Sequence, residues 1–219
     1  MPYSYNDSKK LEQLLQQIES YKEHENASPT FRASQALKSI YDIVVSHLEK
    51  EPGHDKDTLT DSIAVLRYLT VSYTRMCRIA YAQKTSDRLI ALEKELYESF
   101  SVIDEECEDD YYNALRLRNY YEKCDIDDLS EAVAEMIPDS RRKEIEAGVK
   151  DRYPLLKHDV IELSDKYLSV IDETERRMYE LGADNMTGFE KMKLRKKLLS
   201  EYGVEWKSPV ELNPNVIFD

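Results

Sequence analysis

The chain has 219 residues, of which 41% are hydrophobic and 34% are charged, and its formal net charge is −13. This length is compatible with one domain or with two. Neutralising phosphates requires clustered Lys and Arg, so the negative charge argues against a general binder of nucleic acid or of anionic membranes.

Signals for the compartment favour the cytoplasm. The first ten residues, MPYSYNDSKK, contain no apolar core of a secretory signal peptide, and no run approaches the ~18 apolar residues of a membrane span. The three cysteines, Cys77, Cys107 and Cys124, form no CxxC pair. An odd number of cysteines without a signal peptide is typical of reduced thiols. We therefore expect a cytoplasmic protein that does not enter a membrane.

The longest uninterrupted segment runs from His54 to Ile137, which is 84 residues without a Gly or a Pro. Gly and Pro are the strongest local signals for turns. Apolar residues recur there at steps of three and four, which predicts long helices joined by tight connections. This segment also carries −9 of the net charge of −13.

In chain order, the same periodicity predicts eight or nine helices. Ser28-Pro29 supplies a cap and a first-turn proline for the second helix, Asp57 or Thr58 caps the third, and Ser86 caps the fourth. The third helix is apolar around most of its circumference, so we expect it at the centre of the fold. The expected helices cover about residues 7–24, 29–50, 59–83, 86–103, 110–123, 125–136, 138–148, 154–181 and 187–202.

The signals near the C-terminus are specific. Gly182 is a natural stop for the helix over 154–181. Thr187 and Glu190 have the spacing of a capping box, which predicts the start of the last helix. Residues 204–219 contain two prolines and alternating apolar residues, so we expect an extended tail that docks on the rest of the protein.

The predicted fold is a single all-α domain over residues 1–219. Possible sub-boundaries lie near residues 50–57, after an N-terminal helical hairpin, and near 138–154. An antiparallel bundle and an irregular array of helical hairpins are both compatible with the pattern. The residue pattern of the 34-residue tetratricopeptide unit is absent, so a repeat array is possible in shape only.

Four carboxylates form a candidate metal site: Glu105, Glu108, Glu122 and Asp125. Carboxylates three residues apart share one helix face, and two such pairs on neighbouring helices can bind Mg²⁺ through oxygen. The arrangement resembles the ExxE…ExxD signature of the all-α nucleotide pyrophosphohydrolases. This resemblance covers only these four positions, and it implies hydrolysis by a metal-bound water. A solvated acidic face is the simpler interpretation.

Tyrosines and a basic helix are the other candidate binding features. The chain has 16 Tyr against four Phe and one Trp. In the pairs Tyr111-Tyr112 and Tyr120-Tyr121, neighbouring side chains diverge by ~100° on a helix, so we expect one of each pair to face outward. Tyr suits protein interfaces. The basic helix over residues 191–197 offers Lys193, Lys196 and Lys197 to a partner, to nucleic acid or to the protein's own acidic segment.

These patterns predict a non-enzymatic adaptor that binds another protein through acidic, Tyr-rich helical surfaces. No nucleophilic triad, histidine metal motif or phosphate-binding glycine loop stands out in the sequence. The first alternative is a Mg²⁺-dependent all-α nucleotide phosphohydrolase, and Mg²⁺ is the only cofactor that it implies. The second alternative is nucleic-acid binding through residues 191–197.

Overall fold

The computed structural model describes residues 5–23, 30–50, 53–121, 126–152 and 156–217. Within these ranges the chain is built from α-helices and short 3₁₀ turns without a β-strand, so the predicted all-α class is confirmed. None of the helices in these ranges is long and apolar enough to cross a lipid bilayer. The elements are α1 (Tyr5–Glu23), α2 (Thr30–Lys50), α3 (Lys56–Arg75), α4 (Ile79–Phe100), α5 (Cys107–Arg118), α6 (Asp127–Ala132), α7 (Asp139–Arg152), η1 (Val160–Leu163), α8 (Asp165–Glu180), η2 (Ala183–Asn185), α9 (Gly188–Glu201) and α10 (Pro209–Leu212).

The chain divides into two compact units. Unit 1 comprises residues 1–118 and 125–153 and holds α1 to α7. Unit 2 comprises residues 119–124 and 154–219 and holds η1 to α10. The single domain expected from the sequence, with its sub-boundaries, stays a prediction.

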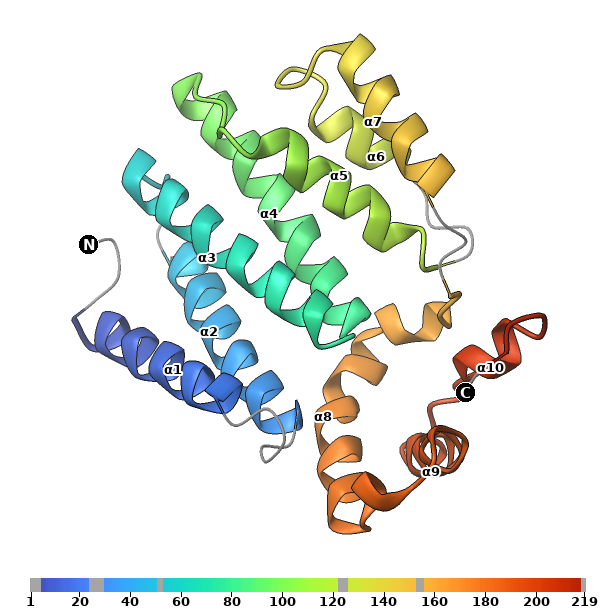
Figure 1. Cartoon of the computed structure of the whole chain (residues 1–219). Coiled ribbons are helices and arrows are strands. Elements are labelled where there is room, and N and C mark those ends of the chain that lie inside the picture. Colours follow the sequence, from blue (N-terminus) through green and yellow to red (C-terminus); the bar gives the residue numbers. More distant parts are fainter. Residues whose placement is uncertain (1–4, 24–29, 51–52, 122–125, 153–155, 218–219) are drawn as a thin grey trace. The chain divides into compact units, whose positions relative to one another are not determined.

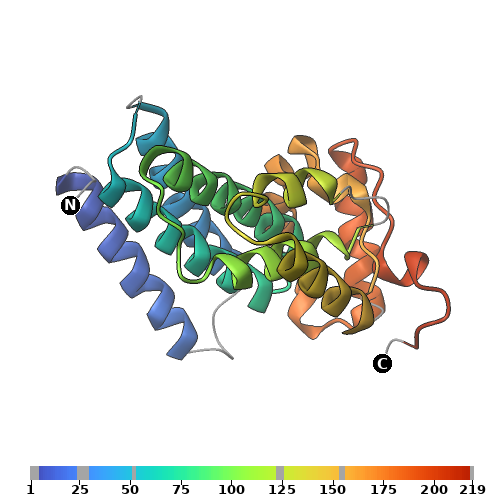
Figure 2. The same cartoon turned by 90° about the horizontal axis from the view of Figure 1, so that it is seen from above.

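In unit 1 the helices follow one another in chain order from α1 to α5, and α6 and α7 lie beyond α5 (Figures 1 and 2). α3 and α4 share the most extensive contact, α2 packs on the other side of this pair against α3, and α5 packs on α4. The third helix therefore has neighbours on two sides, which its broad apolar surface predicted. α4 is at least as central, because it contacts α3, α5 and α6.

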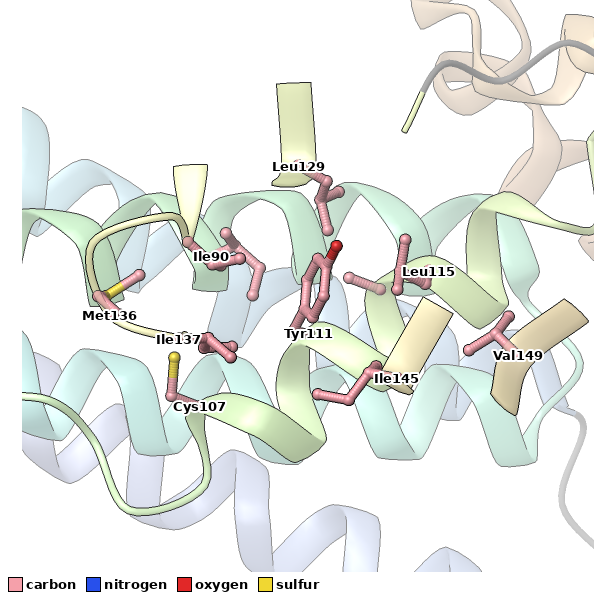
Figure 3. Close-up of a cluster of buried hydrophobic side chains, with 11 residues drawn as sticks. Ile90, Cys107, Tyr111, Leu115, Leu129, Met136, Ile137, Ile145 and Val149 are labelled. Atoms are coloured by element: carbon pink, nitrogen blue, oxygen red, sulfur yellow. The ribbon is translucent and has the colours of Figure 1, made fainter. Parts of the chain in front are cut away.

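The core of unit 1 has two parts. Between α3 and α4 the fully buried side chains are mostly leucines, each contributing about 1.5–3 kcal/mol through burial. The second part lies between α4, α5, α6 and α7, where Tyr111 is surrounded by aliphatic side chains (Figure 3). Its buried members are Ile90, Cys107, Tyr111, Ala114, Leu115, Leu129, Val133, Met136, Ile137, Ile145 and Val149. Packing in this part fixes α5 against α4.

The turn between α3 and α4 corrects the predicted third and fourth helices. α3 ends at Arg75 rather than near residue 83, and α4 begins at Ile79. Ser86, the expected cap of the fourth helix, is buried inside α4. The prediction failed because Ser86 looked like a helix start within a segment that has no Gly to mark the true turn.

Cys77 makes this turn. Its φ is +54°, in the left-handed region that Gly normally occupies. The N–H groups of Cys77 and Arg78 donate to the carbonyls of Thr74 and Tyr73 at 3.0 and 2.9 Å. These two bonds form a Schellman motif, which satisfies carbonyls at the end of α3.

Two further boundaries differ from the sequence prediction. Asp55 caps α3, because its side chain accepts a hydrogen bond from the Thr58 N–H at 2.7 Å, so neither Asp57 nor Thr58 is the cap. α5 begins at Cys107 and ends at Arg118, a few residues earlier than the predicted helix over 110–123. Ser28-Pro29 lies outside the described residues.

In unit 2 the predicted helix over 154–181 is wrong in its first third. α8 begins at Asp165, and Ser164 caps it by accepting a hydrogen bond from the Tyr167 N–H at 3.2 Å. The preceding 3₁₀ turn is held by Glu162, a buried carboxylate that accepts hydrogen bonds from Trp206 Nε1 at 2.7 Å and His158 Nδ1 at 2.9 Å. These bonds come from residues distant in sequence or outside the helix, so periodicity could not reveal them.

The end of unit 2 follows its local signals more closely. Gly182 has a φ of +79° just after α8, and Thr187 and Glu190 form the predicted capping box. The tail docks through Trp206, which is 2% exposed. A second capping box, from Ser208 and Glu211, starts α10, so the tail expected to be extended contains one helical turn.

We expect Cys77→Gly to stabilise unit 1 by up to about 1 kcal/mol. A non-glycine residue in the left-handed region costs roughly 1–2 kcal/mol, and the greater entropy of an unfolded Gly offsets part of the gain. The Cys77 side chain is exposed, so little packing is lost. Urea unfolding followed by circular dichroism measures the change. Cys77→Ala should resemble the wild type and Cys77→Val should be less stable, whereas equal stability of the Gly and Ala variants would contradict the explanation.

Candidate functional site

The four carboxylates predicted to bind Mg²⁺ can be placed only in part. Glu122 and Asp125 lie outside the described residues. Glu105 is exposed in the segment before α5. Glu108, in the first turn of α5, accepts a hydrogen bond from Arg141 Nε at 2.7 Å. Because an arginine already compensates Glu108, this metal site has no support beyond its sequence spacing and stays a prediction.

The four tyrosines suggested for partner binding differ in exposure. Tyr111 is fully buried, and its hydroxyl donates to Glu146 at 2.8 Å. Tyr121 is also buried. Tyr112 and Tyr120 are half-buried, so they are the members of each pair that reach solvent.

The basic helix α9 is partly engaged within unit 2. Lys196 forms an ion pair with Glu211 of α10. Arg195 pairs with Glu175 at 2.9 Å. Lys193 and Lys197 are exposed. Intramolecular pairing thus reduces the positive charge that this helix offers to a partner.

A different group of carboxylates converges in unit 1. Glu93 of α4, Asp104 of the α4–α5 connection and Asp110 of α5 each bring one oxygen within 4.8 Å of the others. Arg67 of α3 lies among them, with Nη2 at 2.6 Å from both Asp104 Oδ1 and Asp110 Oδ2 and at 3.5 Å from Glu93 Oε1. Arg67 Nε is 2.7 Å from Glu106 Oε2. We call Glu93, Asp104 and Asp110 the carboxylate cluster.

Local backbone structure assembles this cluster. Ser101, with φ of +54°, ends α4, and its N–H donates to the Tyr97 carbonyl at 2.7 Å. The chain then reverses, and Asp104 Oδ1 accepts a hydrogen bond from the Glu106 N–H at 2.9 Å. Asp110 lies in the first turn of α5, where the helix dipole favours a negative charge. The reversal therefore brings two acidic segments over Glu93.

Glu93 is the least ordinary member of the cluster. Its side chain is 1% exposed, and neither carboxylate oxygen accepts a hydrogen bond from any residue that the structure describes. Burial, reinforced by the neighbouring Asp110 carboxylate, raises the pKa of Glu93 to about 9. At neutral pH Glu93 is then protonated, which relieves the repulsion between two buried carboxylates.

The same burial acts on the neighbours of Glu93. It raises the pKa of Asp110, although Arg67 counteracts the shift. Burial and the nearby Glu93 also raise the pKa of the Cys107 thiol, so Cys107 stays a neutral thiol. The buried acidic groups around Arg67 are therefore more stable when they are protonated or lie beside a cation than when they carry an uncompensated negative charge.

A groove of about 210 Å³ adjoins the cluster along the same two helices. Thr70 follows Arg67 by three residues on α3, and Asn113 follows Asp110 by three residues on α5, so the groove begins about one turn beyond this ion pair. We call it the α3–α5 groove. It is lined by Thr70, Val71, Thr74 and Arg75 of α3 and by Asn113, Arg116 and Leu117 of α5.

The α3–α5 groove is rich in unused hydrogen-bond donors. Within the described part of the chain, the guanidinium groups of Arg75 and Arg116 have no ion-pair partner, and the Asn113 amide has no hydrogen-bond partner. Val71, which is 39% exposed, and the buried Leu117 add apolar surface. This combination suits a small group that carries a negative charge beside an apolar part.

Neither the carboxylate cluster nor the α3–α5 groove was predicted from the sequence. The cluster joins residues on three separate elements, and Arg67 is 37 and 43 residues from Asp104 and Asp110. One signal was available, because Glu93 lies between Leu89 and Leu96 on the apolar face of the fourth helix. A carboxylate at such a position requires a buried partner or a proton.

Comparison with models of known protein families, with curated proteins and with solved structures finds no match to this chain.

We expect the stability of unit 1 to fall as the pH rises from about 4.5 to about 9 in a buffer with EDTA. Over this range Glu93 keeps its proton in the folded state and releases it in the unfolded state. The free energy of unfolding therefore falls as the pH rises. Glu93→Gln removes this dependence. At about pH 8.5 the variant should be more stable than the wild type by at least about 1 kcal/mol, because the variant has no proton to retain.

Urea unfolding at several pH values measures this difference. Glu98→Gln, on the same helix but exposed, is the control and should keep the wild-type slope. His54 leaves a residual slope in all variants: burial lowers its pKa, but hydrogen bonds to Glu95 and to the Leu48 carbonyl outweigh burial and raise it. An unchanged slope in Glu93→Gln would show that Glu93 is ionised in the folded protein.

Proposed function

We propose that this chain binds another protein, without catalysis, by accepting an acidic side chain of the partner in the α3–α5 groove. Two arginines in one groove support this function. Arg75 and Arg116 line the same 210 Å³ space and have no acidic partner within the described residues. A partner's carboxylate would supply the missing charge.

The ion pairing of most other arginines, and the shared groove of these two, strengthen the proposal. The protein has 44 acidic residues against 31 basic ones, so an arginine finds a carboxylate easily. Many of the other arginines do so, and these are Arg67, Arg118, Arg141, Arg142, Arg176, Arg177 and Arg195. Arg75 and Arg116 each lie in the last turn of their helix, where the helix dipole favours a positive charge. The dipole explains each arginine separately, but it does not explain why both line the same groove.

The size and lining of the groove fit a side chain better than a metabolite. Pockets for small-molecule ligands usually enclose about 300–1,000 Å³. The hydroxyls of Thr70 and Thr74 are already donated to carbonyls of α3, at 2.9 and 2.8 Å. The free donors are therefore the two arginines and the Asn113 amide, while Val71 offers an apolar contact. An Asp or Glu next to an apolar residue complements this lining.

The surrounding charge favours a peptide over a polyanion. Binding to nucleic acid depends on neutralising many phosphates. The groove has two arginines, and the carboxylate cluster with Asp109 lies beside it. A single acidic side chain can approach the arginines without placing further negative charge near these carboxylates, whereas a run of phosphates cannot.

The other candidate functions have less support. Interface use of Tyr112 and Tyr120 stays a prediction, since both are half-buried. A Mg²⁺-dependent phosphohydrolase built on Glu105 and Glu108 also stays a prediction, as does nucleic-acid binding through residues 191–197. In these last two cases a charged group of the candidate site is already paired within the protein: Glu108 with Arg141, and Lys196 with Glu211.

Selection from a random peptide library displayed on phage tests the proposal. We expect full-length protein to enrich peptides with an Asp or Glu beside an apolar residue. Arg116→Gln should weaken a selected peptide at least about 10-fold in fluorescence anisotropy, because a hydrogen bond to a charged group contributes about 1.5–3 kcal/mol. The double variant Arg75→Gln/Arg116→Gln should weaken it further, and raising the salt concentration should weaken binding to the wild type.

Arg32→Gln is the matched control, since Arg32 is an exposed arginine on α2, away from the groove. This variant should bind like the wild type. Backbone amide NMR shifts should map the peptide to residues 70–75 and 113–117. The proposal is wrong if no peptide is enriched, if the enriched peptides lack acidic residues, or if they bind the double variant as tightly as the wild type.

A further inference from the structure

We propose that the carboxylate cluster of Glu93, Asp104 and Asp110 is a binding site for a calcium ion, which Arg67 occupies with its own positive charge when calcium is absent. This inference is independent of the α3–α5 groove and of the peptide that binds there.

The unsatisfied side chain of Glu93 points to a ligand. Both of its oxygens are buried and accept no hydrogen bond from the described residues, and one of them lies within 4.8 Å of one oxygen of Asp104 and one of Asp110. A buried carboxylate without a partner is costly. Arg67 comes closest, but at 3.5 Å its Nη2 is too distant for a strong hydrogen bond to Glu93. A cation between the three carboxylates would satisfy Glu93 directly.

The dimensions suit calcium. Calcium takes oxygen ligands at about 2.3–2.6 Å, so two oxygens on opposite sides of one ion are about 5 Å apart. The cluster oxygens lie within 4.8 Å of one another, so one calcium ion can reach all three. Magnesium demands near-ideal octahedral geometry at about 2.0–2.1 Å and gives up its water reluctantly, whereas calcium accepts irregular coordination by carboxylates. Carboxylate oxygens exclude the softer metals that prefer thiolate or imidazole.

Arg67 has an alternative partner that would let calcium enter. Its Nε already contacts Glu106, whose side chain is 56% exposed. By turning toward Glu106, the guanidinium can leave Asp104 and Asp110 without losing its charge partner. Asp104 is only partly buried, so the cluster has a side open to solvent, and water can complete the coordination of the ion.

Charge also favours the exchange. Arg67 supplies one positive charge to Glu93, Asp104, Glu106 and Asp110, and it is the only cation paired with any of these four among the described residues. Calcium brings two positive charges, so it compensates these four carboxylates more fully than Arg67 does alone.

Thermal unfolding of the full-length chain tests the site. Protein treated with EDTA is compared in about 5 mM CaCl₂ and in NaCl of equal ionic strength, a calcium concentration that exceeds the Kd of weak carboxylate sites. We expect calcium to raise Tm by on the order of 5 °C at a hundredfold excess over Kd. Isothermal titration calorimetry should find one calcium bound per chain.

Three variants make the result specific. Glu93→Gln should lose the calcium shift, while Glu98→Gln, an exposed carboxylate on the same helix, should keep it. Arg67→Gln removes the competing cation, so its Tm should be lower without calcium and its calcium shift larger than that of the wild type. If Arg67→Gln folds only when calcium is added, that result also supports the site.

Several outcomes would overturn the inference. One is the absence of a calcium shift in the wild type, and another is a shift of equal size in Glu93→Gln, which would reflect screening of surface charge. A smaller calcium shift in Arg67→Gln would show that Arg67 helps to bind the ion instead of competing with it. A larger shift with MgCl₂ than with CaCl₂ would refute the assignment to calcium. None of these results bears on peptide binding to the groove.

Discussion

Unit 1 depends on the ion pairs of one guanidinium. Arg67 on α3 reaches Glu93 on α4, Asp104 in the connection and Asp110 on α5, so a single side chain joins three elements that are otherwise held by apolar packing. Removing one partner from a buried ion pair typically costs about 3–5 kcal/mol, because the remaining charge is left without compensation. Apolar contacts set how closely the helices approach, whereas Arg67 selects which turn of α5 lies opposite which turn of α3.

Two left-handed residues make this arrangement possible. Cys77 ends the α3 helical segment early, and Ser101 ends α4 with a turn of the same hand. The first places α4 antiparallel to α3 with minimal connection, and the second returns the acidic segment 104–110 over Glu93. Each is a non-glycine residue in a conformation that disfavours side chains. Two gains offset this conformational free energy: the hydrogen bonds of the turn satisfy helix carbonyls, and the following helix buries a long apolar face.

The sequence was sufficient for the fold class and for features set by local chemistry. The capping box of Thr187 and Glu190, the stop at Gly182 and the broad apolar surface of α3 depend on neighbours a few residues away, so periodicity and cap chemistry reveal them. The turn at Cys77 could not be found, because no Gly marks it. The start of α8 was misplaced because Glu162 takes its partners from Trp206 and from His158, outside the helix.

The candidate sites could not be predicted from the sequence, because they also depend on contacts between residues that are distant along the chain. Spacing rules find ligands that share one helix, and they selected Glu105 and Glu108, but the converging carboxylates come from two helices and a connection. Even the arginines of the groove, Arg75 and Arg116, are 41 residues apart and become neighbours only through the packing of α4 against both their helices. Of these residues, only Glu93 gave a signal in the sequence, because it is a charged residue on the apolar face of a predicted helix.

The carboxylate cluster and the α3–α5 groove share one seam between α3 and α5. Arg67 Nη2 lies 2.6 Å from Asp110 Oδ2, and the groove begins at the next turn of both helices. Arg75 follows Arg67 by eight residues on α3, and Arg116 follows Asp110 by six on α5. The helices joined by the ion pair therefore also carry the two groove arginines, and the packing of α4 against both helices brings these arginines into one groove. The acidic end of the seam and its basic end are thus products of the same helix packing.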